Sequence, residues 1–350
     1  MTGNTLGWVI VAFVLYLLMM IAIGAFYAKG NNNSEDYFLG GRKLNGFVAA
    51  LSAQASDMSG WLLMGLPGAI YLTGVGGDGW IAIGLFIGTT LNWLFIATKL
   101  RRYTIRANNS VTLPTYFENR FHDDKKVLMT VSSITIVVFF LVYCASALSA
   151  GGQLFESVFG IDYHVALTIG ALVVLVYTFL GGFTAVCVTD FIQGMLMLVG
   201  ILAVPLFAYH FLTGNGATLA AGLEASGADS TNFLNLMKNG DGSNNIVSVI
   251  SGLGWGLGYF GMPHILVRFM AVRDEKEMTK SKATAISWVA LSLGFAVFIG
   301  ILGRAYLPEL VNGNNEKVFI EMIKKVFTVE MRAPFVAGLF LCGILAAIMS

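Results

Sequence analysis

Long apolar runs recur along this chain, and they constrain its fold more than any other feature. We identify nine of them, with approximate bounds of 6–28, 47–72, 79–98, 127–153, 164–182, 184–209, 246–267, 284–306 and 333–350. Each run is close to the roughly 20 residues that a helix needs to cross the hydrocarbon core of a bilayer. Only 12% of the residues are charged, which is about half the share in soluble domains. The sequence therefore predicts an all-α polytopic membrane protein whose surroundings are a lipid bilayer.

Lysine and arginine are unevenly distributed among the connections between these runs. The first, third and seventh connections hold 3, 7 and 5 of them, whereas the N-terminus and the second, fourth and sixth connections together hold only Lys238. Because basic residues concentrate in cytoplasmic loops, we expect those three connections in the cytoplasm and the N-terminus outside. The connections 210–245 and 307–332 are then external loops, and the amphipathic stretch 315–327 is expected to lie on the outer surface.

Two of the runs contain residues that interrupt helices. The run at 47–72 holds Gly60, Gly65, Pro67 and Gly68, and the run at 246–267 holds SGLGWGLGYFGMP, which has five glycines between residues 252 and 261 and then Pro263. Backbone groups that such interruptions free at membrane depth need partners in protein, water or an ion. Both runs also carry a Gly-Trp pair, at Gly60–Trp61 and Gly254–Trp255, where we expect each helix to unwind.

The interrupted runs lie five spans apart, a pattern typical of transporters built from inverted repeats. We expect one transmembrane transporter domain over 1–350 with a five-plus-five inverted-repeat fold, which comprises a leading helix at 6–28, a first repeat at 47–209 and an incomplete second repeat at 246–350. The last apolar run stops at Ser350 without a flanking charge, so we expect a C-terminally truncated chain. The alternative is that the glycines only allow close helix packing, as the spacing Gly254-x-x-x-Gly258 would permit.

Asp57 is the most unusual residue of the apolar runs. Nineteen of the 20 acidic residues lie in loops or near the ends of spans, and Asp57 alone lies deep within one. An aspartate at the centre of a membrane helix costs about 2.5–3.5 kcal/mol and is by default a functional residue. A carboxylate beside unwound carbonyls suits a small hard cation. Two alternatives remain for Asp57. It is a structural aspartate bonded to backbone amides near Gly60, or it is a proton carrier.

Other classes of function find little support in the sequence. The four histidines, His122, His164, His210 and His264, are scattered, and neither an H-E-x-x-H nor a G-x-S-x-G motif is present, so an enzyme or a cofactor is not expected. A channel would show a ring of filter residues. The net charge of +1 argues against a nucleic-acid partner, and no protein partner is indicated.

Six stretches of the sequence resemble the sodium/solute symporter family. They are LGGR (39–42), ASDMSGWLLMGLPGA (55–69), YCASA (143–147), GWGLGYFGMPH (254–264), RFMA (268–271) and ILAAIMS (344–350), and the resemblance runs from residue 6 to residue 350. It implies alternating access in a bacterial inner (plasma) membrane with Na⁺ as the coupling ion. Within the family, the sequence is most similar to the branch that imports L-proline. Proton coupling, or another small organic solute, is the alternative.

The resemblance also implies roles for individual residues. The positions that match the family's sodium site are Ala55, Asp57, Met58, Ala347 and Ser350, and those that match its substrate site are Ser59, Trp61, Gly65, Tyr143, Trp255, Tyr259 and Pro263. A hydroxyl residue follows Ser350 in the family pattern and is absent from this sequence. Arg42 matches a position linked to coupling, or is a plain cytoplasmic cation. Asp190 resembles a residue of the sodium exit route, or is a solvated acid at a span end.

Overall fold

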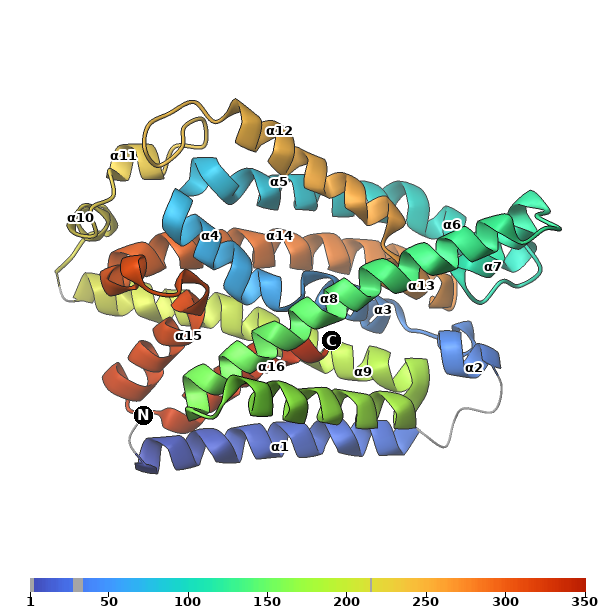
Figure 1. Ribbon diagram of the computed structural model, residues 1–350, viewed down its shortest axis with the longest axis horizontal. Helices are drawn as coiled ribbons and strands as arrows, with labels where there is room; N and C mark the ends of the chain where they lie inside the picture. Colours follow the sequence, from blue (N-terminus) through green and yellow to red (C-terminus); the bar gives the residue numbers. More distant parts are fainter. Residues whose placement is uncertain (1–2, 28–33, 215) are drawn as a thin grey trace.

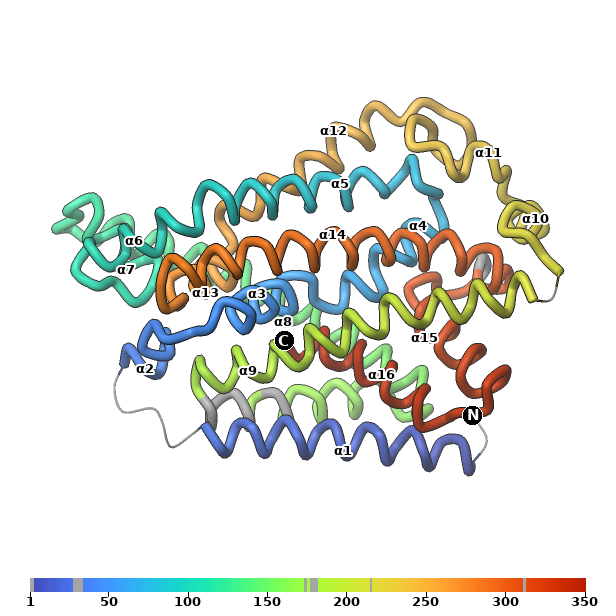
Figure 2. Tube along the Cα trace, turned by 180° about the vertical axis from the view of Figure 1, so that it is seen from behind, coloured from blue at the N-terminus to red at the C-terminus, as the bar shows by residue number. Residues whose placement is uncertain are grey.

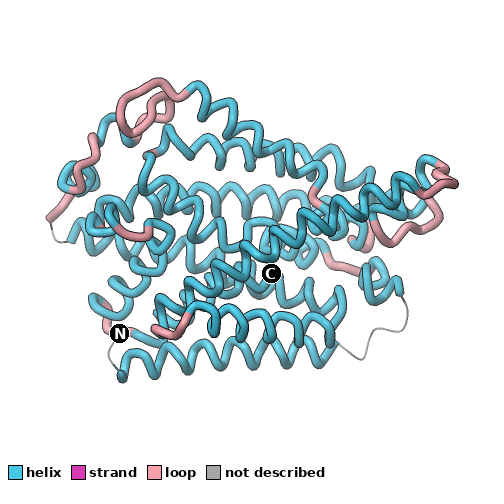
Figure 3. Tube along the Cα trace, in the orientation of Figure 1, coloured by secondary structure: helices cyan, strands magenta, loops and turns pink. Residues whose placement is uncertain are grey.

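The computed structural model describes residues 3–27, 34–214 and 216–350, and of these it describes all side chains except those of residues 173, 174, 177–181, 311 and 312. In chain order, the helical elements are α1 (Gly3–Tyr27), α2 (Ser34–Leu39), η2 (Gly40–Arg42), α3 (Gly46–Gly60), η3 (Trp61–Gly65), α4 (Leu66–Thr73), α5 (Val75–Leu91), η4 (Asn92–Ala97), α6 (Thr98–Arg106), α7 (Leu113–Phe121), α8 (Val127–Phe159), α9 (Tyr163–Gly214), α10 (Leu219–Ala225), α11 (Ser230–Phe233), α12 (Ile246–Trp255), η5 (Gly256–Gly261), α13 (Pro263–Ala271), α14 (Glu275–Tyr306), η6 (Pro308–Asn312), η7 (Asn315–Lys317), α15 (Val318–Ile323), η8 (Lys324–Glu330) and α16 (Pro334–Met349). Among the described residues, extended pairing is limited to two isolated bridges, and loops separate the helices (Figure 3).

Each of the nine apolar runs falls on helical structure, as its composition predicts. Five of the described helices are long and apolar enough to cross a membrane: α1, Val75–Arg106, α8, Gly182–Gly214 and α14. A sixth candidate is the bent pair Ile246–Gly261 and Pro263–Ala271. The chain is thus an all-helical, multi-pass membrane protein, and the count of nine spans stays a prediction. Residue 28, where the first run was expected to end, lies outside the described residues.

The long helices run roughly side by side as a bundle (Figure 1). In that view α5 and α12 lie along the top, α14 passes through the middle and α1 lies along the base, while α8 crosses the front. The view from behind shows the second half of α9 between α14 and α1 (Figure 2), and α9 contacts α1, α3, α14 and α16. The C-terminal residue lies in the interior of the bundle in both views. The fold therefore brings Ser350 to the middle of the molecule.

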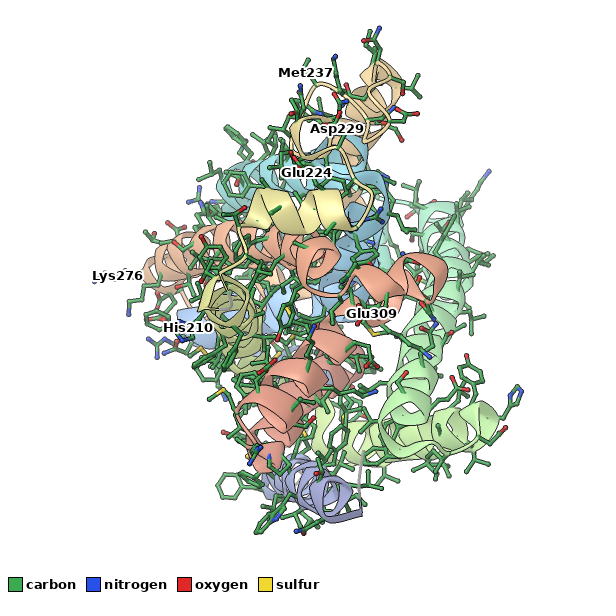
Figure 4. All side chains as sticks on the ribbon, turned by 90° about the vertical axis from the view of Figure 1, so that its left-hand side faces the viewer. His210, Glu224, Asp229, Met237, Lys276 and Glu309 are labelled. Atoms are coloured by element: carbon green, nitrogen blue, oxygen red, sulfur yellow. The ribbon has the colours of Figure 1, made fainter. Side chains whose placement is uncertain are left out.

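Segments from the three basic connections gather at one end of the bundle, at the right of Figure 1, where α2, α6, α7 and α13 lie. There Arg102 forms an ion pair of 2.7 Å with Glu275. Asp274 caps α14, because its carboxylate accepts a hydrogen bond of 2.9 Å from the Glu277 amide, and that bond holds the pKa of Asp274 below its ordinary value. The other end carries α10, α11 and η6, and Figure 4 shows His210, Glu224, Asp229 and Glu309 there. This segregation agrees with the sidedness expected from the charges.

The amphipathic stretch 315–327 packs into the bundle through its apolar side chains. Val318, Phe319, Met322, Ile323 and Val326, the predicted apolar face, are all at most 1% exposed, and α15 contacts α4, α9, α14 and α16. Just before α15, the Asn315 side-chain amide donates a hydrogen bond of 3.0 Å to the Gly68 carbonyl. The segment therefore packs its predicted apolar face into the bundle and covers α4, and its location on the outer side of the membrane stays a prediction.

Glycines allow α5 to approach α12 and η5 at backbone distance. A Cβ atom at Gly84 would overlap the backbone of Gly252, and one at Gly88 would overlap the backbone of Gly256. By contrast, a Cβ at Gly254 or at Gly258 would meet nothing within 4 Å. The close packing that the sequence suggested is therefore real, but its glycines are Gly252 and Gly256, and the proposed Gly254–Gly258 pair was the wrong register.

We expect Gly88→Ala to destabilise the protein, because the added methyl group would press on backbone atoms that cannot rotate away. Overpacking of this kind costs about 1–3 kcal/mol. The thermal unfolding midpoint of the purified protein in detergent should fall, while the matched variant Gly258→Ala, which adds the same methyl group in open space, should leave it nearly unchanged. Equal midpoints for the two variants would contradict this packing.

Candidate functional site

The first interrupted helix is broken at Ser59. This residue has φ 47° and ψ −167°, which lies outside the helical region, and π-helical turns follow it over Trp61–Gly65. The break therefore comes one residue before the predicted Gly60–Trp61 pair. Pro67 lies in the first turn of α4, where its missing N–H causes no loss, so the proline does not cause the break. The regular helical hydrogen-bond pattern is interrupted there, and the Met58 carbonyl accepts a hydrogen bond from the Trp61 amide.

The second interrupted helix changes direction near its own proline. Helix α12 ends at Trp255, a 3₁₀ stretch follows over Gly256–Gly261, and Met262 is extended. Pro263 then begins α13, and the two halves are bent by 46°. The predicted Gly254–Trp255 pair therefore marks the point where the α-helix gives way to 3₁₀ turns, whereas the bend itself lies at Met262, seven residues later.

Oxygen atoms of α3 and α16 meet at the Ser59 break. The Ser350 hydroxyl donates a hydrogen bond of 2.9 Å to the Ala55 carbonyl and lies 3.4 Å from the Ala347 carbonyl. Three members of the predicted sodium set are therefore adjacent, although 295 residues separate Ala55 from Ser350. Carbonyl and hydroxyl oxygens are the ligands that a small hard cation prefers. Met58 is buried at the same break.

The carboxyl group of Asp57 lies apart from this oxygen cluster. Asp57 is only 9% exposed, and its neighbour is the hydroxyl of Tyr259 in η5. Since each residue of a helix turns by 100°, Asp57 and Ala55 face nearly opposite sides of α3. The broken segments of the two interrupted helices therefore meet through Asp57 and Tyr259.

A small polar cavity lies beside the same break. It has a volume of about 250 Å³ and is lined by Ser59, Gly60, Trp61, Met64, Gly65, Tyr143, Ser146, Ala147, Ser149, Ala150, Gln153 and Glu316. Drug-sized ligands occupy sites of about 300–1,000 Å³, so this cavity suits a smaller solute. Four predicted substrate residues, Ser59, Trp61, Gly65 and Tyr143, line it together.

The remaining three predicted substrate residues are divided among different places. Trp255 stacks on Trp61, with ring centroids 5.8 Å apart and an interplanar angle of 26°. It therefore lies behind the Trp61 ring and does not line the cavity itself. Tyr259 is 2% exposed and lies beside Asp57. Pro263 lines a separate, largely apolar groove with His264 and Arg268. The structure therefore does not unite the seven residues in one pocket.

Asp190 is buried in an ion pair. Arg268 Nη2 lies 2.8 Å from its carboxylate, and the side chains of Arg268 and Asp190 are 7% and 0% exposed. Ser52 donates a hydrogen bond of 2.7 Å to the same carboxylate, and Arg268 donates one of 2.7 Å to the hydroxyl of Ser56. The expected alternative of a solvated acid at a span end is therefore wrong.

This ion pair joins elements on the basic side of the Ala55–Ser350 cluster. Ser52 and Ser56 are on α3, Asp190 is on α9 and Arg268 is on α13. Helix α9 is itself interrupted before Asp190, at Gly182, whose φ of 63° and ψ of −169° repeat the conformation of Ser59. This interruption lies where the predicted apolar runs 164–182 and 184–209 meet. The network can thus hold three separately hinged elements together.

Arg42 holds the three basic connections together. Its guanidinium donates hydrogen bonds to the Asn109 side chain (3.0 Å), the Met270 carbonyl (2.8 Å) and the Ser110 carbonyl (2.8 Å). The residue is 9% exposed, and this burial lowers the pKa of Arg42, which Glu35 opposes. Arg42 is therefore no plain solvated cation of a cytoplasmic loop.

Several residues of the site escaped the sequence interpretation. Ser146, Ser149 and Gln153 on α8 line the cavity, and their spacing of three and four residues in an otherwise apolar helix is the signal that could have found them. Arg268 was quoted only as part of a motif. Its pairing with Asp190 could not be predicted from the sequence, because no local sequence pattern specifies how α9 is rotated relative to α13.

The model of the sodium:solute symporter family matches residues 37–350. The chain is 44% identical over 347 residues to sodium/proline symporters of Salmonella typhimurium and Escherichia coli, and 43% identical over 343 residues to one of Staphylococcus aureus. These alignments cover 97% of this chain but only 66%, 66% and 64% of the relatives.

The fold is also similar to that of a solved transporter structure. It is the substrate-bound, outward-open state of a Na⁺-coupled sialic acid symporter, which superposes with a TM-score of 0.79 and 20% sequence identity, over 98% of this chain and 71% of the other. At this identity the likeness concerns the arrangement of the helices.

We expect the buried ion pair to be strongly coupled. Asp190→Leu or Arg268→Met alone should lower stability by about 3–5 kcal/mol, because each leaves an uncompensated buried charge. The double variant should recover more than half of that loss in thermal unfolding measured in detergent. Arg102→Gln, which removes an exposed ion pair with Glu275, should change stability by no more than about 1 kcal/mol. Additive losses at Asp190 and Arg268 would contradict the pairing.

Proposed function

Because the chain belongs to the sodium:solute symporter family, we propose that it is a secondary active symporter that imports L-proline together with Na⁺ by alternating access. The observation that carries this proposal is the meeting of the Ala55 and Ala347 carbonyls with the Ser350 hydroxyl at the Ser59 break, beside a small polar cavity. A transporter, rather than an enzyme, follows from the same family membership. Relatives named sodium/proline symporters support the choice of solute and ion.

Sodium is bound, in this proposal, by the Ala55, Met58 and Ala347 carbonyls and the Ser350 hydroxyl. Neutral oxygens can hold a monovalent cation without the strong charge that a divalent ion needs. Since Ala55 and Ser350 belong to α3 and α16, the ion would fix these two helices against each other. Ion binding would then favour one arrangement of the bundle over another.

The solute is bound in the cavity between α3, η3 and α8. The flat rings of Trp61 and, behind it, Trp255 offer an apolar wall for a pyrrolidine ring. Ser146, Ser149 and Gln153 present polar groups to the carboxylate and the amine. The cavity adjoins the sodium ligands through the Ser59 break, so the two sites share α3.

The Arg268–Asp190 pair closes the route from the sodium site toward the basic end. An ion that moves toward Asp190 would compete with the Arg268 guanidinium for the carboxylate, so release is coupled to the opening of the pair. Arg42 would transmit that opening, because it bonds to the Met270 carbonyl two residues beyond Arg268. In this way Arg42 and Asp190 serve coupling and ion exit.

The topology that we propose has nine spans, of which 6–28 leads, 47–209 forms a first repeat and 246–350 belongs to a second, inverted repeat. The similar breaks in α3 and in α12–η5–α13 support the repeat. The gathering of the basic connections at one end supports a cytoplasmic location for them. The N-terminus is then outside a bacterial plasma membrane.

Proton coupling, or a different small solute, is the second candidate. The observation that favours it is the buried carboxyl group of Asp57, which lies outside the cluster at Ser350. In a proton-coupled symporter, the rate of solute uptake would depend on pH and would not change with the sodium concentration. Competition of labelled L-proline uptake by a panel of unlabelled amino acids, sugars and organic anions separates the solutes.

We expect Ser350→Ala to raise the sodium concentration for half-maximal proline uptake by about 10–100-fold, since loss of a supporting oxygen weakens ion binding. Uptake of labelled proline into proteoliposomes at graded sodium concentrations measures this. The matched variant Ser132→Ala, whose hydroxyl bonds only carbonyls of its own helix, should behave as the wild type. An unchanged sodium dependence in Ser350→Ala would overturn the assigned ion site.

We expect Trp61→Ala to raise the KM for proline by at least tenfold. Burial of a large apolar side chain contributes about 1.5–3 kcal/mol, and 1.4 kcal/mol corresponds to a factor of ten. Trp8→Ala is the matched control, because Trp8 is 52% exposed on α1, away from the cavity. A KM that rises equally in both variants would place the solute elsewhere.

A further inference from the structure

An apolar groove lies between α5 and α14, which pack side by side (Figure 1). Its volume is about 410 Å³, and the described residues that line it are all apolar or glycine, among them Ile83 and Phe86 of α5 and Leu293 and Gly294 of α14. A Cβ atom at Gly294 would meet nothing within 4 Å, so the groove is open at this residue. Because both helices are long enough to cross a membrane, the groove faces the hydrocarbon of the bilayer.

Toward the basic end of the bundle, a lysine lies in the seam between the same two helices. Lys282 and Leu293 are eleven residues apart in α14, and eleven steps of 100° leave an offset of only about 20° around the helix. The ammonium of Lys282 lies 3.5 Å from the Leu94 carbonyl of η4, the element that directly continues α5. Lys282 is therefore on the groove-lining face of α14 and next to the helix that forms the other wall.

Two arginines of α6 lie near Lys282. Arg102 forms its ion pair with Glu275 at 2.7 Å, and both side chains are more than half exposed, so the pair contributes little to stability and leaves Arg102 accessible to a second anion. Arg101 donates a hydrogen bond of 2.6 Å to the Val272 carbonyl. Lys282 and both arginines act electrostatically on Glu275. These three cations, which we call the basic cluster, thus outnumber the carboxylate that they surround.

The basic cluster lies at the level of lipid headgroups. Lys282 precedes the apolar run 284–306 by two residues, and Arg101 and Arg102 follow the run 79–98 within four. Half of a hydrocarbon core of roughly 30 Å is about 15 Å, which corresponds to about ten residues of helix. Leu293 of the groove wall is eleven residues from Lys282. An acyl chain that begins at a headgroup on the cluster therefore reaches the groove.

We propose that the basic cluster and the groove together bind a phospholipid with an anionic headgroup. Its phosphate would lie against Arg102 and Lys282, and one acyl chain would follow the seam between α5 and α14 to Gly294. Basic pockets between membrane helices attract anionic headgroups on the cytoplasmic side, where the leaflet is negatively charged. The apolar groove in line with the cluster favours a lipid over a soluble phosphate compound. This inference goes beyond the proposed symport and takes from it only the cytoplasmic location of the basic connections.

The lipid would join two parts of the bundle that hold the broken helices. Helix α14 packs against α3 and α4, whereas α5 packs against α12 and η5. A phosphate shared by Arg102 of α6 and Lys282 of α14 would hold these two parts together at the basic end. Lipid binding would therefore favour the arrangement in which α5 and α14 are in contact over one in which they separate.

The test is thermal unfolding of the purified full chain in detergent, titrated with phosphatidylglycerol or with phosphatidylethanolamine of the same acyl chains. We expect the anionic lipid to raise the unfolding midpoint, because a ligand that binds the folded state stabilises it, and the zwitterionic lipid to need an about tenfold higher concentration. Lys282→Gln should raise the half-saturating concentration of phosphatidylglycerol about fivefold, since one cation near the headgroup is lost. Lys125→Gln is the matched control, because Lys125 is exposed between α7 and α8 at the same end of the bundle and should behave as the wild type.

The groove is tested separately from the charges. Gly294→Leu places a side chain in the open groove without changing the basic cluster, and it should also weaken phosphatidylglycerol binding about fivefold, because the acyl chain loses apolar contact. Glycerol phosphate, which carries the phosphate without an acyl chain, should leave the midpoint of the wild type unchanged at the same concentration.

Four results would overturn the proposal. They are equal effects of Lys282→Gln and Lys125→Gln, equal half-saturating concentrations for the two lipids, unchanged binding in Gly294→Leu, and stabilisation by glycerol phosphate that equals that by phosphatidylglycerol. A wild-type midpoint that does not respond to either lipid would overturn it as well. Because no transport is measured, each of these results leaves the proposed symport intact, and a failure of sodium-driven proline uptake would in turn leave the lipid site intact.

Discussion

The break of α3 at Ser59 is the constraint on which the rest of the structure depends. In a lipid bilayer a helix normally satisfies its own backbone, and freed carbonyls persist only where protein, water or an ion accepts them. Here the Ala55 carbonyl is bonded by the Ser350 hydroxyl of α16. The same break places Ser59 and Trp61 at the wall of a polar cavity. One interruption therefore positions both the Ala55–Ser350 contact and the wall of the polar cavity.

Three further arrangements support that interruption. Glycines let η5 approach α5 closely, which carries Tyr259 to Asp57. The segment η7–α15 covers α4 through the bond from Asn315 to Gly68. The Arg268–Asp190 pair forms hydrogen bonds with the hydroxyls of Ser52 and Ser56 on α3. The broken helix is thus held by neighbours on several faces, each with its own polar contact, and a change in any of these contacts would alter the others.

The sequence predicted those features that are written along single segments. Apolar runs predicted the helices, and the Gly60–Trp61 pair placed the break of α3 to within one residue. The Gly254–Trp255 pair marked only the end of α12, because the bend that follows lies at Met262. A resemblance of motifs grouped Ala55 with Ser350, which the structure brings into contact. It could not show that Tyr259 turns toward Asp57 or that Pro263 lines a different groove. Those facts depend on the rotation of one helix against another, which is set by packing and not by spacing. Of the two interpretations of Asp190, the solvated acid was wrong, because a position near a span end does not reveal the Arg268 guanidinium that α13 brings to it.

The most direct test of the account is uptake of labelled L-proline into vesicles that hold the protein, with either a sodium gradient or a pH gradient imposed alone. If the oxygen cluster of Ala55, Ala347 and Ser350 is the coupling site, the inward sodium gradient will drive accumulation above equilibrium and the pH gradient without sodium will not. Accumulation that the pH gradient drives in the absence of sodium, with no response to a sodium gradient, would contradict it.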